Sequence, residues 1–339
     1  MSLNLINSKI TLKNRPDPSI TEDLFDLKTE ELKELKDDEL LVDVKYVSID
    51  PAMRGWISDV GNYSKPVAID ETMRSLGVGK IISSKDRGFN ENEYVVGWLG
   101  WQKYAVVNKS AIQIKVNPNE VPLSANLGAL GLNGITAFAG LVDICKPKKK
   151  ETIVVTTAAG SVGSAVGQIA KIYGCNTIGF TSSDEKAEIC KTEFGYDEVI
   201  NYKKTDNLSS CLKQIAPNGI DCFFDNVGGD QFDAVMENVN INARVVICGT
   251  IGMPSYPIPN GPRINRTLLV KRAKIEGLLV LDYFNRYKEI YDQLAKWLKD
   301  GKLRNKEDIS HGLSKAPSSL VKILNGLNLG KQLIKLWKD

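Results

Sequence analysis

"VVTTAAGSVGSAVGQIAKIYGC", Val154 to Cys175, runs from β-branched residues through a turn of small residues into a helical pattern that Gly174 closes. Within the turn, Ala158, Gly160 and Gly163 have the spacing A-x-G-x-x-G, a variant of the dinucleotide fingerprint. Because glycine lacks a Cβ, Gly160 lets a pyrophosphate approach the backbone, and Gly163 lets the helix pack closely on the strand. The first amides of the helix then face the phosphates. The stretch therefore predicts the first strand, turn and helix of a nucleotide-binding domain.

The region around this stretch, from about Leu123 to Asp300, alternates β-branched runs with helical patterns. The runs include "NTIGFT", "IDCFFDNV", "ARVVICGT" and "KIEGLLV", and the predicted helices are Val162 to Tyr173, Asp184 to Phe194, Leu208 to Ala216 and Tyr287 to Leu298. Such alternation predicts a parallel, doubly wound sheet. The residues before this region read as short strands broken by Gly, Pro and Asn, and those after it mix a helix with a final strand. With 339 residues, the chain is long enough for two domains.

The composition is that of an ordinary globular protein, with 42% hydrophobic residues, 25% charged residues and a net charge of +3. The densest basic run, Lys146 to Lys150, has no interleaved aromatic residues to stack bases, so we expect a solvated loop and no nucleic-acid partner. The N-terminus lacks the apolar core of a signal peptide, and no window approaches the roughly twenty apolar residues that span a bilayer. A cytoplasmic protein without a membrane segment is expected.

The cysteines and the single histidine make a metal site improbable on composition alone. The six cysteines stand singly, with no CxxC pair, and are expected to be reduced and mostly buried. His311 is the only histidine, so the usual His and Cys ligands of zinc are hard to assemble, and no nucleophile-elbow motif is present for a hydrolase. We therefore expect no metal.

The end of the second strand decides which nicotinamide nucleotide fits, because an acidic residue there would bind a free ribose 2′-hydroxyl. Here the strand end carries Thr181 to Ser183, while Asp184 and Glu185 are expected to open the next helix, where carboxylates suit the dipole. Lys186, one turn into that helix, could partly neutralise a 2′-phosphate. The pattern favours NADPH over NADH.

Six blocks spread over nearly the whole chain carry a family resemblance: "SIDPAMRGWISDVGNYSKPV", "GWLGWQKY", "GLNGITAFAGLVDICKPKKKETIVVTTAAGSVGSAVGQIAK", "GIDCFFDNVGG", "VVICGTI" and "LNLGKQLI". They resemble the zinc-independent medium-chain dehydrogenase/reductases, in the branch of alkenal/one oxidoreductases, prostaglandin reductases and NADPH-dependent curcumin reductase. The resemblance implies an α/β protein with a GroES-like β-rich catalytic domain, residues 1–122 and 303–339, and a Rossmann domain, residues 123–302. It also implies a homodimer.

The resemblance also implies a set of residues that contact NADPH. The turn would contact the pyrophosphate, Lys186 and Tyr202 would lie near the adenosine 2′-phosphate, and the remaining positions would line the nicotinamide half. The full set is Ala159, Gly160, Ser161, Val162, Gly163, Lys186, Tyr202, Asn226, Cys248, Gly249, Thr250, Ile251, Leu278, Leu279, Val280 and Asn328.

The activity implied is reduction of a carbon-carbon double bond conjugated to a carbonyl. Hydride passes to the β-carbon, charge builds on the carbonyl oxygen, and a proton then reaches the α-carbon, so the site needs a hydrogen-bond donor more than a strong base. Tyr63 matches a tyrosine of the curcumin-reductase type that borders the substrate, and Tyr256 is the second candidate proton donor.

Two departures from the family pattern bear on the substrate. Ala52 stands where relatives usually have an aromatic residue, which predicts a wider or shifted pocket. Val270 stands at about the position of a tyrosine that lies near the nicotinamide in the prostaglandin-reductase branch, so curcumin reductase is the nearer model. Two alternatives to an enone or enal reductase stay open: a quinone oxidoreductase of the same superfamily, and a non-enzymatic protein that binds NADPH or single-stranded RNA.

Overall fold

The computed structural model describes residues 5–17, 19–60, 63–253 and 259–337, which form two compact units. One unit comprises Met1–Leu127 with Glu307–Asp339, and the other comprises Gly128–Lys306. The joins drawn from the sequence fall at 122/123 and 302/303.

The second unit is built on one six-stranded sheet in which every neighbouring pair is parallel. Its strands, in spatial order, are β10 (Glu198–Asn201), β9 (Asn176–Thr181), β8 (Thr152–Val155), β11 (Ile220–Asp225), β12 (Val239–Ile247) and β13 (Lys274–Gly277). The strand order reverses between β8 and β11. This arrangement confirms the doubly wound sheet, and the reversal marks the crevice where such folds bind ligands.

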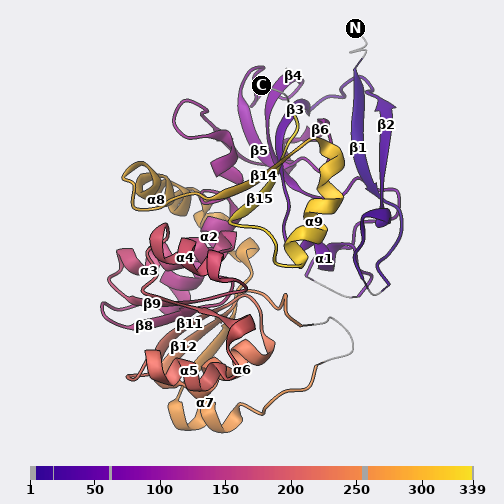
Figure 1. The fold of residues 1–339 in the computed structure, drawn as a ribbon. Helices are drawn as coiled ribbons and strands as arrows, with labels where there is room; N and C mark the ends of the chain where they lie inside the picture. Colours follow the sequence, from indigo (N-terminus) through magenta and orange to yellow (C-terminus); the bar gives the residue numbers. More distant parts are fainter. Residues whose placement is uncertain (1–4, 18, 61–62, 254–258, 338–339) are drawn as a thin grey trace. The chain divides into compact units, whose positions relative to one another are not determined.

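Helices cover both faces of this sheet, with α2 and α3 on one side and α5 and α6 on the other (Figure 1). They are α2 (Leu132–Phe138), which continues as a π-helix (Ala139–Cys145), α3 (Ser161–Ile172), α4 (Asp184–Thr192), α5 (Leu208–Ile215), α6 (Gly229–Glu237), α7 (Asn265–Lys271) and α8 (Tyr287–Lys299). The four helices expected from the sequence begin within one residue of the prediction. The helices α2, α6 and α7 were not predicted.

The first unit is β-rich and contains strands from both ends of the chain, as the resemblance implied. A seven-stranded sheet contains β14 (Glu307–His311), β15 (Lys331–Lys335), β3 (Glu39–Ser48), β4 (Leu76–Ser84), β5 (Tyr94–Trp98) and β7 (Ile112–Val116) in that order, with β6 (Tyr104–Asn108) also paired to β3. A separate hairpin joins β1 (Ile6–Leu12) and β2 (Phe25–Glu31), and the α-helices in the described part of this unit are α1 (Met53–Trp56) and α9 (Ala316–Leu324).

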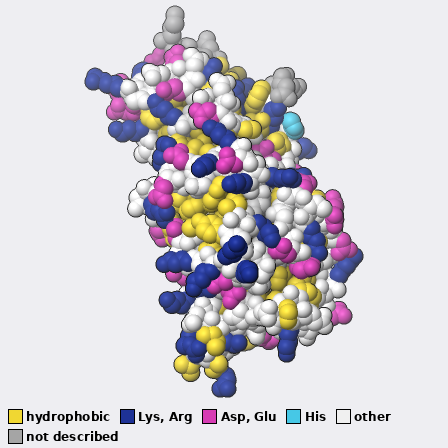
Figure 2. Space-filling model, turned by 90° about the vertical axis from the view of Figure 1, so that its left-hand side faces the viewer, with side chains coloured by type: hydrophobic (Ala, Val, Ile, Leu, Met, Phe, Trp, Pro, Cys, Tyr) yellow, Lys and Arg dark blue, Asp and Glu magenta, His cyan; other side chains and the backbone are white. Residues whose placement is uncertain are grey.

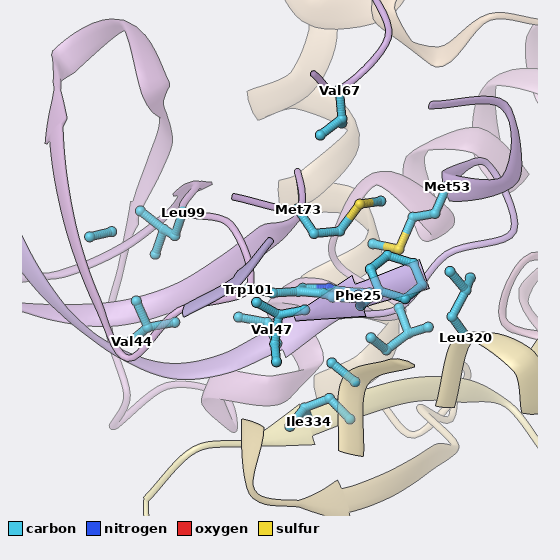
Figure 3. Packing of buried hydrophobic residues seen from close by; sticks show 14 of the residues in the cluster. Phe25, Val44, Val47, Met53, Val67, Met73, Leu99, Trp101, Leu320 and Ile334 are labelled. Atoms are coloured by element: carbon cyan, nitrogen blue, oxygen red, sulfur yellow. The ribbon is translucent and has the colours of Figure 1, made fainter. Parts of the chain in front are cut away.

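The core of this unit joins residues that are distant in sequence (Figure 3). Trp101 is fully buried and lies 5.4 Å from Phe25, centroid to centroid, at a tilted angle. Leu320 of α9 and Ile334 of β15 belong to the same buried cluster. The C-terminal residues are therefore part of the hydrophobic core formed by the first hundred residues.

Candidate functional site

The turn between β8 and α3 leaves no room for side chains at its glycines. A Cβ on Gly163 would lie 2.2 Å from the carbonyl oxygen of Thr157 and 2.9 Å from the Cα of Ala158, which confirms that this glycine allows close packing. A Cβ on Gly160 would lie 2.8 Å from Cγ2 of Thr157, so the turn itself also requires glycine there. Thr157 has a φ of +56°, a left-handed conformation that few non-glycine residues adopt.

The N-terminus of α3 has no side-chain cap, unlike those of the next two helices. Its N-cap residue is Gly160, which offers no side-chain acceptor. In contrast, the Ser183 side chain accepts from the amide of Lys186 at the start of α4, and Asn207 accepts from Ser210 at the start of α5. The first amides of α3 therefore suit an external anion such as a pyrophosphate.

A buried tyrosine, Tyr196, packs against α3 at Gly163 and Gly167. Its hydroxyl donates to the carbonyl of Gly163 at 2.7 Å, and its ring lies so close to Gly167 that a Cβ there would be 2.2 Å from Cζ. Sequence reasoning missed this residue. The available signal was the pair of glycines at 163 and 167, which lie four residues apart and therefore on one face of the helix.

The ends of β9 and β10 bring together polar and basic groups. Asp184 opens α4 as predicted, and its carboxylate accepts from Asn201 Nδ2 at 2.7 Å and forms an ion pair with Lys204. Lys186 is half-buried two residues further on, in the first turn of α4, and Tyr202 is half-buried directly after β10, where burial raises its pKa. Because Lys204 neutralises the charge of Asp184, the positive charge of Lys186 is left to attract a phosphate in this region.

A buried carboxylate that no motif had singled out lies at the carboxyl end of β11. Asp225 is 1% exposed and accepts hydrogen bonds from Thr156 Oγ1 at 3.0 Å, from the amide of Val227 at 3.0 Å and from the amide of Gly228 at 3.0 and 3.1 Å. Burial raises the pKa of this carboxyl, and these donors oppose the rise. The carboxylate thus ties β11 to the end of β8.

The predicted cofactor residue Asn226 is held by the same contacts. Its amide donates to Thr156 Oγ1 at 2.7 Å, and its side-chain Nδ2 donates to the Thr156 carbonyl at 2.8 Å. These bonds orient the side chain so that Oδ1 is the atom that can face a ligand.

The loops that follow β11 and β12 are bonded to each other, which brings Cys248 to Ile251 beside Asn226. Cys248 donates its amide to the carbonyl of Asp225 at 2.8 Å, and Ile251 donates to the carbonyl of Asn226 at 3.3 Å. Burial, together with the nearby charge of Asp225, raises the pKa of the Cys248 thiol to about 12. This thiol is therefore protonated at neutral pH and is a poor nucleophile.

Leu278 to Val280 follow β13, which ends at Gly277, so they lie after the strand and not within it as the sequence suggested. Leu278 donates its amide to the carbonyl of Ile247 at 2.9 Å. A Cβ on Gly140, in the π-helix, would lie 2.9 Å from Leu278 and 2.5 Å from the Phe224 ring. This glycine lets the helix pack against both side chains, and sequence reasoning did not identify it.

All predicted cofactor residues of this unit thus follow the carboxyl ends of strands in one parallel sheet, which is the edge where such sheets bind ligands. They divide into a group after β9 and β10, the turn after β8, and a group after β11, β12 and β13. The switch point lies between the last two groups.

Three further candidates belong to the other unit or lie outside the described residues. Tyr63 is 54% exposed in the segment between α1 and β4. Asn328 precedes β15 and donates Nδ2 to the carbonyl of Gly330 at 2.9 Å. Tyr256 lies outside the described residues, so its position is not part of the site described here.

Among the described residues, no group of three or more His, Cys, Asp or Glu side chains is arranged to hold a metal ion. Figure 2 shows Lys and Arg interspersed with Asp and Glu on the face that it draws. That face therefore shows no continuous patch of one charge.

Comparison with known proteins places both units in described families. Residues 8–114 match the N-terminal domain of oxidoreductase, and residues 161–297 match the zinc-binding dehydrogenase model. The chain is 36% identical to the NADP(+)-dependent 2-alkenal reductase of Nicotiana tabacum, over 100% of both chains, and 33% identical to the NADPH-dependent curcumin reductase of Escherichia coli, over 98% of both. The crystal structure of CurA from Vibrio vulnificus in complex with NADPH is similar with a TM-score of 0.91 and 36% identity, covering 98% of this chain and 100% of that one.

Proposed function

Because the chain belongs to the medium-chain dehydrogenase/reductases, in the branch of alkenal, curcumin and prostaglandin reductases, we propose that it is an NADPH-dependent reductase of α,β-unsaturated aldehydes and ketones. The observation that carries this proposal is the row of predicted cofactor residues after the carboxyl ends of six parallel strands. Zinc plays no part in the proposed reaction.

Features of the second unit fit NADPH. The uncapped N-terminus of α3 would hold the pyrophosphate, with the glycines at 160 and 163 admitting it to the backbone. Lys186 and Tyr202 would hold the adenosine 2′-phosphate. The carboxylate of Asp184, which could otherwise accept from the ribose 2′-hydroxyl of NADH, forms an ion pair with Lys204. Asn226, Cys248 to Ile251 and Leu278 to Val280 of the same unit would hold the nicotinamide half.

When bound, NADPH supplies the hydride for the β-carbon of the conjugated double bond. The residues of this chain would orient the substrate and handle the negative charge that develops on the carbonyl oxygen. Tyr63 and Tyr256 are the proposed donors to that oxygen and the proposed sources of the proton for the α-carbon. Tyr63 is 54% exposed.

We also propose a homodimer located in the cytoplasm. Among the described residues, β13 is an edge strand of the six-stranded sheet. The backbone groups on its open side can pair with the same strand of a second copy of the chain. Leu269 and Val270, on α7 directly before this strand, are 78% and 52% exposed, which supplies apolar area beside the edge.

In the described part of the chain, no helix has the length and apolar character to cross a bilayer.

The test is NADPH consumption by purified protein, followed by its absorbance, with a 2-alkenal, an aryl enone, a benzoquinone and a saturated ketone. The proposal expects the enal and the enone to be consumed, with saturated carbonyl products and little activity when NADH replaces NADPH. Consumption of the quinone alone would favour a quinone oxidoreductase. Binding of NADPH without turnover of any compound would favour a non-enzymatic role.

A further inference from the structure

Asp225 is a buried negative charge without a cationic partner. None of the described Lys, Arg or His side chains forms an ion pair with it, and its neighbours are one hydroxyl and two backbone amides. Buried carboxylates are costly and are usually paired with a cation or a metal. An unpaired one at a predicted binding edge therefore needs an explanation.

The hydrogen bonds suit the ionised form of this carboxylate. The backbone amides of Val227 and Gly228 can only donate to Asp225, and the hydroxyl of Thr156, whose oxygen accepts from the amide of Asn226, lies within donating distance of Oδ1. Backbone amides cannot accept a hydrogen bond from a neutral carboxylic acid, and the partner of Oδ2 is such an amide, that of Gly228. The three donors thus stabilise a full negative charge at this position.

The place of this charge in the sheet relates it to one end of the cofactor. A dinucleotide binds across the switch point, here between β8 and β11, with its pyrophosphate at the first helix. The basic residues suited to the adenosine phosphate follow β9 and β10, so the nicotinamide half belongs on the side of β11, β12 and β13. Asp225 lies at the end of β11, and its backbone carbonyl accepts hydrogen bonds from the amides of Cys248 and Gly249, in the loop after β12.

The nicotinamide ring is neutral in NADPH and carries one positive charge in NADP⁺. When the C4–H bond breaks and its electron pair forms the new bond at the β-carbon, this positive charge appears on the ring. We propose that Asp225 is a positioning residue whose buried negative charge favours NADP⁺ over NADPH in the site and so promotes hydride donation. This inference rests on the proposed function, because it assumes that the site binds NADPH.

The test compares the dissociation constants of NADP⁺ and NADPH, measured by calorimetry or by protein fluorescence, in the wild type and in variants. Asp225→Asn removes the charge and keeps the shape, and Asp225→Ser is a second variant that can still accept from the amides. Both should raise the ratio of Kd for NADP⁺ to Kd for NADPH by about tenfold, which is the effect of one charge over roughly 10 Å at an effective dielectric constant of about 20. For this two-electron couple, tenfold raises the potential of the bound cofactor by about 30 mV.

Thr156→Val is the matched control, because it removes two hydrogen bonds of the same network, those of Oγ1 with Asp225 and with the amide of Asn226, and keeps the charge. It should weaken the binding of both forms to a similar extent and leave their ratio within about twofold of the wild type. An unchanged ratio in both Asp225 variants would overturn the inference while leaving the proposed function intact. Failure of the wild type to bind NADPH would overturn both.

Discussion

Adding one methyl group at Gly163 should disturb the pyrophosphate site more than its size suggests. The Cβ of Gly163→Ala would lie 2.2 Å from the Thr157 carbonyl oxygen, about 0.8 Å closer than side chains tolerate, and its neighbours there are backbone atoms that cannot rotate away. The start of α3 must therefore move by nearly 1 Å. Overpacking of this kind costs about 1–3 kcal/mol, which corresponds to a fall in Tm of about 3–10 °C for a unit of this size.

The same displacement should weaken NADPH binding by at least about tenfold, because a misplacement of about 1 Å can cost up to roughly a hundredfold. Thermal unfolding and NADPH titration of the variant measure the two effects. Gly261→Ala is the control, since its Cβ would meet only Asp233 Oδ2 at an ordinary 3.8 Å, and both quantities should stay near wild type. An unchanged Tm together with an unchanged Kd for NADPH in Gly163→Ala would refute the packing argument.

Three further predictions concern the cofactor preference, the proton donor and acid stability. Lys186→Met should raise the KM for NADPH about ten- to a hundredfold and leave the KM for NADH unchanged, through loss of a charge-assisted contact, whereas Lys213→Met, at an exposed position of α5, should change neither. Tyr63→Phe should lower kcat for an aryl enone about a hundredfold with little effect on the KM for NADPH, and an unaltered kcat would exclude this phenol as the proton donor. Burial raises the pKa of Glu151, but hydrogen bonds and charge from Arg244, at 3.0 Å, outweigh it and hold that pKa below its ordinary value of 4.5. Because the carboxyl of Glu151 binds a proton more readily in the unfolded chain, its ion pair stabilises the fold above pH 4.5, and this stabilisation is lost as the pH falls through the lower pKa of the folded state. The free energy of unfolding in urea should therefore fall less steeply between about pH 5 and 3 for Glu151→Gln than for the wild type.

Much of the architecture could be predicted because its signals are local. The helical patterns after each strand placed α3, α4, α5 and α8 within two residues at both ends. The helices α2, α6 and α7 were missed. The buried residues of α2 are consecutive, from Gly134 to Phe138, and so mark no periodic face, α6 begins at Gly229 in a glycine-rich turn, and α7 has no buried residue.

The contacts within the candidate site could not be predicted, because they join residues distant in sequence. Thr156 and Asp225 are 69 positions apart, and only the pairing of β8 with β11 brings them within 3.0 Å. The hydrogen bond of Tyr196 to Gly163 spans 33 positions in the same way. A motif located the glycine turn, but the residues that hold it in place depend on the order of the strands.

The strand β15 has a consequence for how the protein matures on the ribosome. It lies between β14 and β3, so the sheet that contains β3 is completed only after β14 and β15, which are more than 250 residues further along the chain. The unit Gly128–Lys306 is continuous in sequence and can fold as soon as it has been translated. The unit that contains β3 therefore finishes folding after the other one, and until β15 has been made, Tyr46 to Ser48 of β3 lack a partner strand on the side opposite β4.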